Sequence, residues 1–389
     1  MLSDAIAAFY NSHPYPPPVT NLDRARDEWR DPNRLRAEYH FVWPDEPYRS
    51  DLDVLVAGCG TWQAARYALT HPDARVIGID VSTTSLEHTE RLKQQYALTN
   101  LETRQLAMEY VGALDRAFDL IVCTGVLHHL VDPDAGLLAL RNALKPGGAM
   151  HLMVYGRYGR TGISMLKEYC GALGVGTSEQ EINDLIATLV PVTRDHPAAA
   201  HLRDARDFQN TDALADALLN PRERSYSVPE LFDLLERNCC SFGRWYRQAP
   251  YLPTCGAIAR TPHASRIATL PVRKQYAAME LWRGTIATHS VFVHRDDDAR
   301  PGVKIRRDAV PIRLPHTVCV QERLPPGAAG VLLNRSHQHT DLVLPIDARQ
   351  KKQFDAIDGT RTMAEIGGDP AFFETLWRYD QVAWRSASR

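Results

Sequence analysis

Residues 51–80 restrict the fold of this chain more than any other stretch. They open with the apolar run Val54–Ala57, which is short, β-branched and bounded by glycine, as expected of a buried strand. Gly58-Cys59-Gly60 follows at once, then a stretch of helical composition from Gln63 to Leu69, and then a second apolar run that ends at Asp80. A strand, a glycine turn, a helix and a second strand in this order open a doubly wound α/β sheet.

The glycine turn and the acid that ends the second run predict a nucleoside ligand. Glycines let the backbone approach a ligand closely, and an acid at the end of the second strand accepts hydrogen bonds from ribose hydroxyls. The separation of Gly58 from Asp80 is close to the spacing of about 20 residues expected for such a pair. The dinucleotide pattern G-x-G-x-x-G is incomplete, because Gln63 stands at the third glycine, so NAD is the weaker interpretation.

Composition narrows the class of protein. Lys and Arg number 45 against 47 Asp and Glu, and this balance disfavours a nucleic-acid partner. No apolar run is long enough to span a bilayer, and the first residues lack the basic start and apolar core of a signal peptide. The seven cysteines form no C-x-x-C pair, so we expect free thiols in a reducing, cytoplasmic setting.

Four motifs carry a family resemblance. VLVAGCGT, GIDVS, FDLIVCTGVLHHL and LKPGG occur in this order and at normal spacing over roughly residues 50–160. On these residues the chain resembles the class I S-adenosylmethionine (SAM)-dependent methyltransferases. The resemblance implies an α/β fold with a doubly wound, seven-stranded Rossmann-like sheet whose last strand is antiparallel, and it implies S-adenosyl-L-methionine as the cofactor.

Two positions depart from the family pattern. Val56 aligns with an acid that the family usually carries before the glycines, and Trp62 aligns with the usual third glycine of the turn. Both changes lie beside the methionine and ribose part of the cofactor, and neither removes the ribose-binding acid, Asp80.

The resemblance also implies which residues contact the cofactor. They are Ala57, Gly58, Cys59, Gly60 and Gln63 at the turn, Asp80 and Val81 after the second strand, Ala107 and Met108 after the third, and Thr124 after the fourth. An apolar Met108 suits a flat adenine, but a methionine in the core is equally ordinary.

Residues for the methyl acceptor are expected where the fourth and fifth strands end, because this edge faces the ligand crevice in doubly wound folds. We predict His128, Tyr10 and Tyr15 as catalytic residues, and Tyr155, Arg157 and His129 as acceptor-binding residues. Packing is the competing interpretation: Leu-His-His recurs in the family among enzymes with unrelated acceptors, aromatic residues beside turns pack well, and loop arginines are commonly solvated. We expect no metal site, because His337-Gln338-His339 has no third ligand placed by spacing.

The sequence predicts that the whole chain is divided into three parts. Residues 1–50 form an N-terminal arm or lid, residues 51–295 form the SAM-binding domain with a helical insertion at about 161–221, and residues 296–389 form a small α+β domain. RDDDARPGVKIRRD reads as the linker before this last part, which loosely resembles a winged-helix or PqqD-type domain at FDAIDGTRTMAEI. An interaction or dimerisation role is expected there.

The sequence thus predicts a SAM-dependent methyltransferase that acts on a small molecule or a peptide. The alternative is a non-catalytic SAM-binding or protein-interaction module that keeps the methyltransferase fold, and Val56 and Trp62 favour it. A membrane partner is not expected, and a homodimer is left open.

Overall fold

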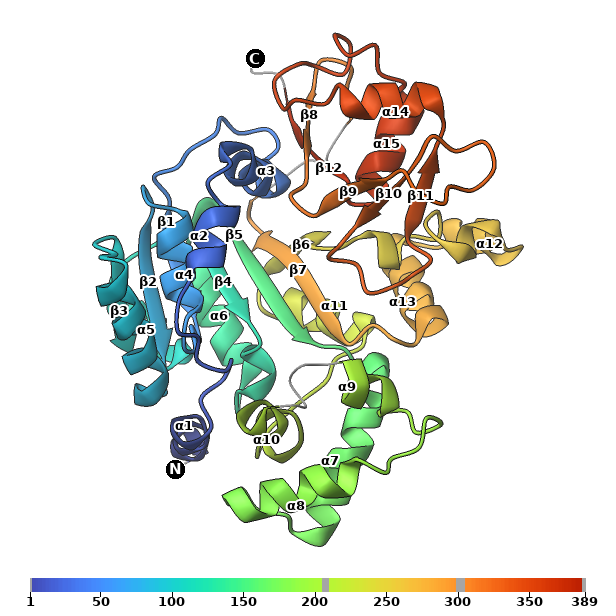
Figure 1. Ribbon diagram of the computed structural model, residues 1–389. Helices are drawn as coiled ribbons and strands as arrows, with labels where there is room; N and C mark the ends of the chain where they lie inside the picture. The colour runs from blue at the N-terminus through green and yellow to red at the C-terminus, as the bar shows by residue number, and fades with distance from the viewer. Residues whose placement is uncertain (1, 205–209, 299–304, 387–389) are drawn as a thin grey trace. The chain divides into compact units, whose positions relative to one another are not determined.

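The computed structural model describes residues 2–204, 210–298 and 305–386 (Figure 1). The chain groups into two compact units. The first unit consists of Met1–Ala25, Asp51–Phe242 and Gly284–Asp298, and the second of Arg26–Ser50, Gly243–Arg283 and Ala299–Arg389. The three-part division expected from the sequence stays a prediction, and the middle of its expected linker, residues 299–304, lies outside the described residues.

A seven-stranded sheet forms the centre of the first unit, with the order β3-β2-β1-β4-β5-β7-β6. The strands are β1 (Asp53–Ala57), β2 (Arg75–Asp80), β3 (Leu101–Gln105), β4 (Phe118–Thr124), β5 (Leu144–Tyr155), β6 (Cys240–Trp245) and β7 (Thr288–Arg295). β1 pairs in parallel with β2 and β4, whereas β7 pairs antiparallel with β5. The predicted doubly wound, seven-stranded sheet with an antiparallel last strand is therefore confirmed.

The strand order reverses between β1 and β4, which neighbour each other although β2 and β3 separate them in sequence. In open α/β sheets, ligands bind outside the carboxyl ends of the strands at such a switch point. The apolar residues of β1 are buried on both faces; Leu55, Val56 and Ala57 have no exposed surface. The fold thus directs attention to the loops that follow β1, β2, β4 and β5.

Helices cover the sheet of the first unit (Figure 1). Those around the sheet are α1 (Leu2–Ser12), α4 (Gln63–Thr70), α5 (Thr83–Gln95), α6 (Pro133–Ala143) and α11 (Val228–Arg237), with the 3₁₀ turns η1 (Met108–Leu114), η2 (Leu127–His129) and η3 (Tyr158–Arg160). α2 (Asp23–Glu28) lies where the chain passes from the first unit to the second. Ser82 caps α5 by accepting from the Ser85 amide at 3.1 Å, which fixes where that helix begins beside Asp80.

The predicted helical insertion contains α7 (Thr161–Leu173), α8 (Glu179–Leu189), α9 (Ala199–Asp204) and α10 (Thr211–Leu219). Its apolar residues form one buried cluster with Phe9 of α1, in which Ile163, Leu185 and Leu214 are nearly inaccessible. α1 and α10 lie side by side (Figure 1), joined by a hydrogen bond from Tyr10 to Asp216. The N-terminal helix and the insertion therefore share one apolar core.

The second unit holds a three-stranded sheet, β11-β10-β9, and a two-stranded sheet, β12-β8. Its elements are α3 (Pro32–Val42), η5 (Ala249–Tyr251), η6 (Ala257–Arg260), α12 (His263–Ala268), α13 (Val272–Arg283), β8 (Val310–Arg313), β9 (Thr317–Val320), β10 (Gly330–Asn334), β11 (Val343–Ile346), α14 (Ala348–Asp355), α15 (Pro370–Arg378) and β12 (Val382–Arg385). Phe354 of α14, Phe373 of α15 and Trp384 of β12 pack into a common core. The C-terminal part thus has the α+β composition expected from the sequence.

Two further observations concern the whole described chain. Among the described helices, none has both the length and the apolar character needed to cross a membrane. All seven cysteines are free thiols, and Cys59, Cys123, Cys170, Cys240 and Cys255 are buried.

Candidate functional site

The turn between β1 and α4 requires glycine at two positions. Gly58 and Gly60 have φ angles of +69° and +55°, in the left-handed region that side chains with a Cβ rarely adopt. A Cβ on Gly58 would lie 2.3 Å from Val126 Cγ2. The amides of Gly58 and Cys59 both donate to the carbonyl of Ile79, at 2.8 and 2.9 Å, so the turn is fixed to the end of β2.

The Asp80 carboxylate lies directly against this turn. Its Oδ2 accepts from the Gly60 amide at 2.8 Å, and its Oδ1 accepts from the Ser82 amide at 2.9 Å. Burial raises the pKa of Asp80, and these backbone amides oppose the rise. Each carboxylate oxygen has a second lone pair, so the group can still accept from the hydroxyls of a ribose.

The other predicted cofactor residues lie around the same strand ends. The Gln63 side chain donates to the Thr124 hydroxyl at 2.8 Å, which joins the start of α4 to the end of β4. Met108 is 4% exposed, and its sulfur lies 3.9 Å from Cys123 Sγ. Ala107 and Val81 are half-buried beside the ends of β3 and β2. The structure thus places the residues of the turn, Asp80, Val81, Ala107, Met108 and Thr124 at one edge of the sheet.

The N-terminal arm packs on this edge. A Cβ on Gly60 would lie 2.7 Å from Pro16 Cδ and 2.8 Å from the Tyr15 carbonyl oxygen. The Thr61 hydroxyl donates to the Pro16 carbonyl at 2.6 Å, and the Ser82 hydroxyl donates to the Tyr10 carbonyl at 3.1 Å. Residues 10–16 therefore adjoin both the glycine turn and the start of α5.

Four predicted acceptor-side residues meet in one aromatic cluster. The His128 ring lies 4.2 Å from that of His129 and 3.8 Å from that of Tyr155, measured between centroids. His129 also meets the edge of the Tyr10 ring at 6.1 Å. The electrostatic influence of Tyr15 on the Tyr155 phenol places Tyr15 near the same group. Residues from α1, β5 and η2 thus converge beyond the strand ends.

His128 lies deeper than the sequence could indicate. It has no exposed surface, and within the part of the chain that the structure describes neither ring nitrogen has a hydrogen-bond partner. Desolvation, followed by the charges of His129, Arg160 and Lys167, holds its pKa well below the usual range, so the ring is neutral at pH 7. A neutral imidazole can accept a proton, but the rings around it must move before an acceptor reaches it. Its catalytic role stays a prediction.

Four charged residues also join this cluster, and three of them, Glu223, Lys167 and Asp216, were missed by the sequence analysis. The buried Arg160 guanidinium lies 3.5 Å from the centroid of the Tyr155 ring and contacts Glu223 at 3.1 Å. Lys167 contacts the same carboxylate at 3.4 Å. Asp216 of α10 accepts from the Tyr10 hydroxyl at 2.8 Å. These residues belong to the insertion or its flanks, where no motif marks them, and only the folded chain brings them together.

Arg157, in contrast, does not join the cluster. It is exposed and contacts Glu230 of α11 at 2.5 Å. Glu230 also accepts from the amide of Ser227, which begins α11. A surface pair of this kind contributes little to stability, so the predicted acceptor role of Arg157 would require it to exchange partners.

Two other features lie in the second unit. His337, from the His337-Gln338-His339 stretch, contacts Asp380 through its Nε2 at 3.0 Å. Within the described residues, no group of three His, Cys, Asp or Glu side chains could hold a metal ion.

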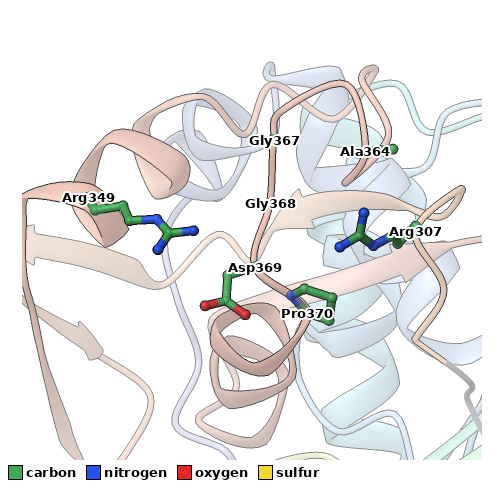
Figure 2. Close-up of a pocket in the computed structure, with 7 residues that line it drawn as sticks. All are labelled: Arg307, Arg349, Ala364, Gly367, Gly368, Asp369 and Pro370. Carbon is green, nitrogen blue, oxygen red and sulfur yellow. The ribbon is translucent and has the colours of Figure 1, made fainter.

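A surface pocket of about 370 Å³ is flanked by Arg307 and Arg349 around Asp369 (Figure 2). The Asp369 carboxylate caps α15 through the Ala371 amide at 3.0 Å, which accounts for its place there.

Comparison with known proteins identifies the class. Residues 55–150 match the family described as "Methyltransferase domain". The chain is 32% identical over 250 residues to an uncharacterized protein of Synechococcus, a match covering 62% of this chain and 59% of that protein. It is 31% identical over 131 residues to a tRNA U34 carboxymethyltransferase of Desulfotalea psychrophila, covering 33% of this chain and 39% of that enzyme. The chain thus spans about three-fifths or less of the length of these two curated relatives.

A solved structure shares the fold over nearly the whole chain. PKMT2 from Rickettsia typhi, in complex with AdoHcy, has a TM-score of 0.64 and 16% identity, covering 96% of this chain and 78% of PKMT2. The chain therefore has a class I methyltransferase fold, residues 55–150 match the methyltransferase domain, and the resemblance given by the four motifs is confirmed. The further likeness of the C-terminal part to a PqqD-type or winged-helix domain finds no support and stays a prediction.

Proposed function

We propose that this protein is a SAM-dependent methyltransferase that acts on a small molecule or a peptide. The observation that carries the proposal is the Asp80 carboxylate, which holds the glycine turn at the switch point of a methyltransferase-type sheet. Asp80 lies where an acid of this fold would accept from ribose hydroxyls.

The residues present fit this cofactor. Asp80 keeps lone pairs free for two hydroxyls, and Met108 with Ala107 offers an apolar surface for a flat base. Gln63 and Thr124 supply polar groups near the turn. Val56 is fully buried in β1, so it offers no contact for the amino-acid tail, which the backbone of the turn must hold instead. S-adenosylmethionine, when bound, supplies a methyl group already activated by a sulfonium.

For the acceptor, we propose the aromatic cluster beyond β4 and β5. This proposal is supported by the contact of the Tyr155 and His129 rings beyond the strand ends and by the approach of Tyr10 and Tyr15 from the arm. Holding donor and acceptor in line can supply most of the rate enhancement of such a transfer. His128 remains proposed as the base, which requires the rings around it to move. Arg157 remains proposed as an acceptor contact, which requires it to leave Glu230.

The experiment is methyl transfer from labelled SAM to fractions of small metabolites and of peptides, with the Asp80→Ala variant as the blank. Label in either fraction that requires Asp80 supports the proposal and selects the acceptor class. A protein that binds the cofactor but labels neither fraction would favour the non-catalytic module instead. A homodimer, a cytoplasmic location and the absence of a nucleic-acid partner stay predictions.

Tyr10→Phe is expected to lower kcat by about tenfold and to leave the affinity for S-adenosylhomocysteine within about twofold. The variant removes the hydroxyl that donates to Asp216 and accepts from Asn220 at 3.0 Å, and a hydrogen bond to a charged group contributes about 1.5–3 kcal/mol. Steady-state kinetics and calorimetry together separate the two effects. Tyr15→Phe tests the second tyrosine in the same way, and unchanged kcat in both variants would return the arm to a packing role.

A further inference from the structure

Asp216 is a buried carboxylate whose hydrogen-bond partners are neutral. It is 2% exposed, and its Oδ1 accepts from the Tyr10 hydroxyl at 2.8 Å and from the Asn220 amide at 3.1 Å. Within the described residues, Oδ2 has no hydrogen bond and Asp216 has no ion pair. A buried charge without a counterion carries a penalty of several kcal/mol, which a cationic ligand would offset.

The positive charges nearby already have other partners. Arg160 and Lys167 both contact Glu223, at 3.1 and 3.4 Å, and His13 contacts Asp212 at 3.2 Å. His129 is close enough to feel the charge of Asp216, but burial holds its pKa below the usual value, so it is neutral at pH 7. Asp216 is therefore the carboxylate of this cluster that a bound ligand could neutralise.

The surroundings of Asp216 offer hydrogen-bond acceptors. The charge of Asp216 acts on the phenols of both Tyr10 and Tyr155, so the two hydroxyls lie in its neighbourhood. Among the described residues, the Tyr155 hydroxyl has no hydrogen-bond partner. The fully buried His128 ring has no hydrogen-bond partner at either nitrogen among the described side chains, and it lies tilted against the same Tyr155 ring with 3.8 Å between centroids. An ammonium group has three donors and no acceptor, which matches a carboxylate flanked by phenol oxygens.

We propose that the methyl acceptor is an amine, positioned by the carboxylate of Asp216. This inference rests on the proposed function and names its substrate class. Hydroxyl, carboxylate and thiolate acceptors bring no positive charge, so they would leave Asp216 buried and uncompensated. A cationic amine would supply the missing counterion and would pack its stem against the Tyr10 and Tyr155 rings.

The bound ammonium first releases one proton, which His128 as the proposed base accepts and passes to solvent, and the nitrogen lone pair then forms a bond to the methyl carbon. The bond from sulfur to that carbon breaks and its electron pair stays on sulfur, which gives S-adenosylhomocysteine and a methylammonium product. Positive charge thus moves from sulfur to nitrogen, and the Asp216 carboxylate stabilises it where it develops.

The test is calorimetric titration of the full chain, saturated with S-adenosylhomocysteine, with n-hexylamine hydrochloride and with n-hexanol at pH 7. The two probes share their apolar chain and differ in charge. We expect the amine to bind at least about tenfold more tightly than the alcohol, which corresponds to about 1.4 kcal/mol. Asp216→Asn keeps the shape and the hydrogen bonds to Tyr10 and Asn220, removes only the charge, and should abolish this preference.

Asp212→Asn is the matched control, because Asp212 lies one turn away on the same helix and its carboxylate contacts His13. It should keep the preference for the amine. Equal binding of both probes by the wild-type protein, or binding of neither, contradicts the amine proposal while the cofactor proposal stands. The wild-type comparison needs no variant, so a poorly folded Asp216→Asn protein would not obscure the result. Failure of S-adenosylhomocysteine itself to bind contradicts both proposals.

Discussion

Replacing Asp80 by alanine is expected to weaken the binding of S-adenosylhomocysteine by at least about 30-fold. The carboxylate is the group at the glycine turn that can accept from both ribose hydroxyls. Each hydrogen bond to a charged group contributes about 1.5–3 kcal/mol, so losing two exceeds the roughly 2 kcal/mol that a 30-fold change requires. The same change removes the acceptor of the Gly60 and Ser82 amides, at 2.8 and 2.9 Å, so the turn also loosens. Isothermal titration calorimetry measures the affinity.

The control for Asp80 is Asp73→Ala, which removes an exposed carboxylate in the turn before β2. It should bind the cofactor product as the wild-type protein does. Circular dichroism on both variants establishes that they are folded. An Asp80→Ala protein that is folded and binds with unchanged affinity would show that the ribose lies elsewhere, and the cofactor assignment would fall with it.

Glu223→Ala is expected to destabilise the first unit by about 3–5 kcal/mol, the range for breaking a buried ion pair at one partner. The Glu223 side chain is 5% exposed and holds both Arg160 and Lys167. Its loss leaves two cations in a poorly solvated cluster and frees Arg160, which lies over the Tyr155 ring. Denaturant unfolding followed by circular dichroism measures the change.

Arg157→Ala provides the comparison for Glu223. The contact of Arg157 with Glu230 joins side chains that are 47% and 40% exposed, and such pairs contribute about 0–1 kcal/mol. Equal effects of the two substitutions would mean that the Glu223 cluster is solvated in the native protein, against the burial described above. The same Arg157→Ala protein tests the predicted acceptor contact, since a raised KM would support that role.

Most of the fold of the first unit could be predicted from local sequence patterns. The apolar runs of β1 and β2 are buried strands because short continuous runs of mostly β-branched residues are typical of parallel strands that are covered on both faces. Gly58 and Gly60 could be predicted as a ligand turn because such a turn needs positive φ angles, which glycine adopts readily. Asp80 could be predicted as its partner because one helix and one strand fix its position relative to the turn. In each case neighbours in sequence determine the outcome.

The acceptor cluster depends on contacts that no local pattern encodes. Arg157 and Arg160 stand three residues apart in one loop, yet η3 leaves the first exposed and buries the second over Tyr155. Asp216 and Tyr10 belong to helices 206 positions apart, joined through a hydrogen bond. Side-chain chemistry indicated which residue types could contact an acceptor. Only the packing of α1 against α10 shows which of these residues lie together.

The composition of the second unit also could not be predicted from local sequence patterns. Residues 26–50 and 243–283 group with the C-terminal part, through contacts such as the Ser386 amide donating to the Pro44 carbonyl at 2.8 Å. Composition shifts and prolines mark where a chain turns, but they do not indicate which distant segment it pairs with.

The most direct measurement is calorimetric titration of the wild-type protein with S-adenosylmethionine and with S-adenosylhomocysteine. The account predicts one site with micromolar affinity for both, a binding free energy of about −8 kcal/mol, because the turn, Asp80 and the apolar wall beside Met108 are in place. Absence of binding by either compound would mean that Val56 and Trp62 have disabled the site, and the methyltransferase proposal would be contradicted.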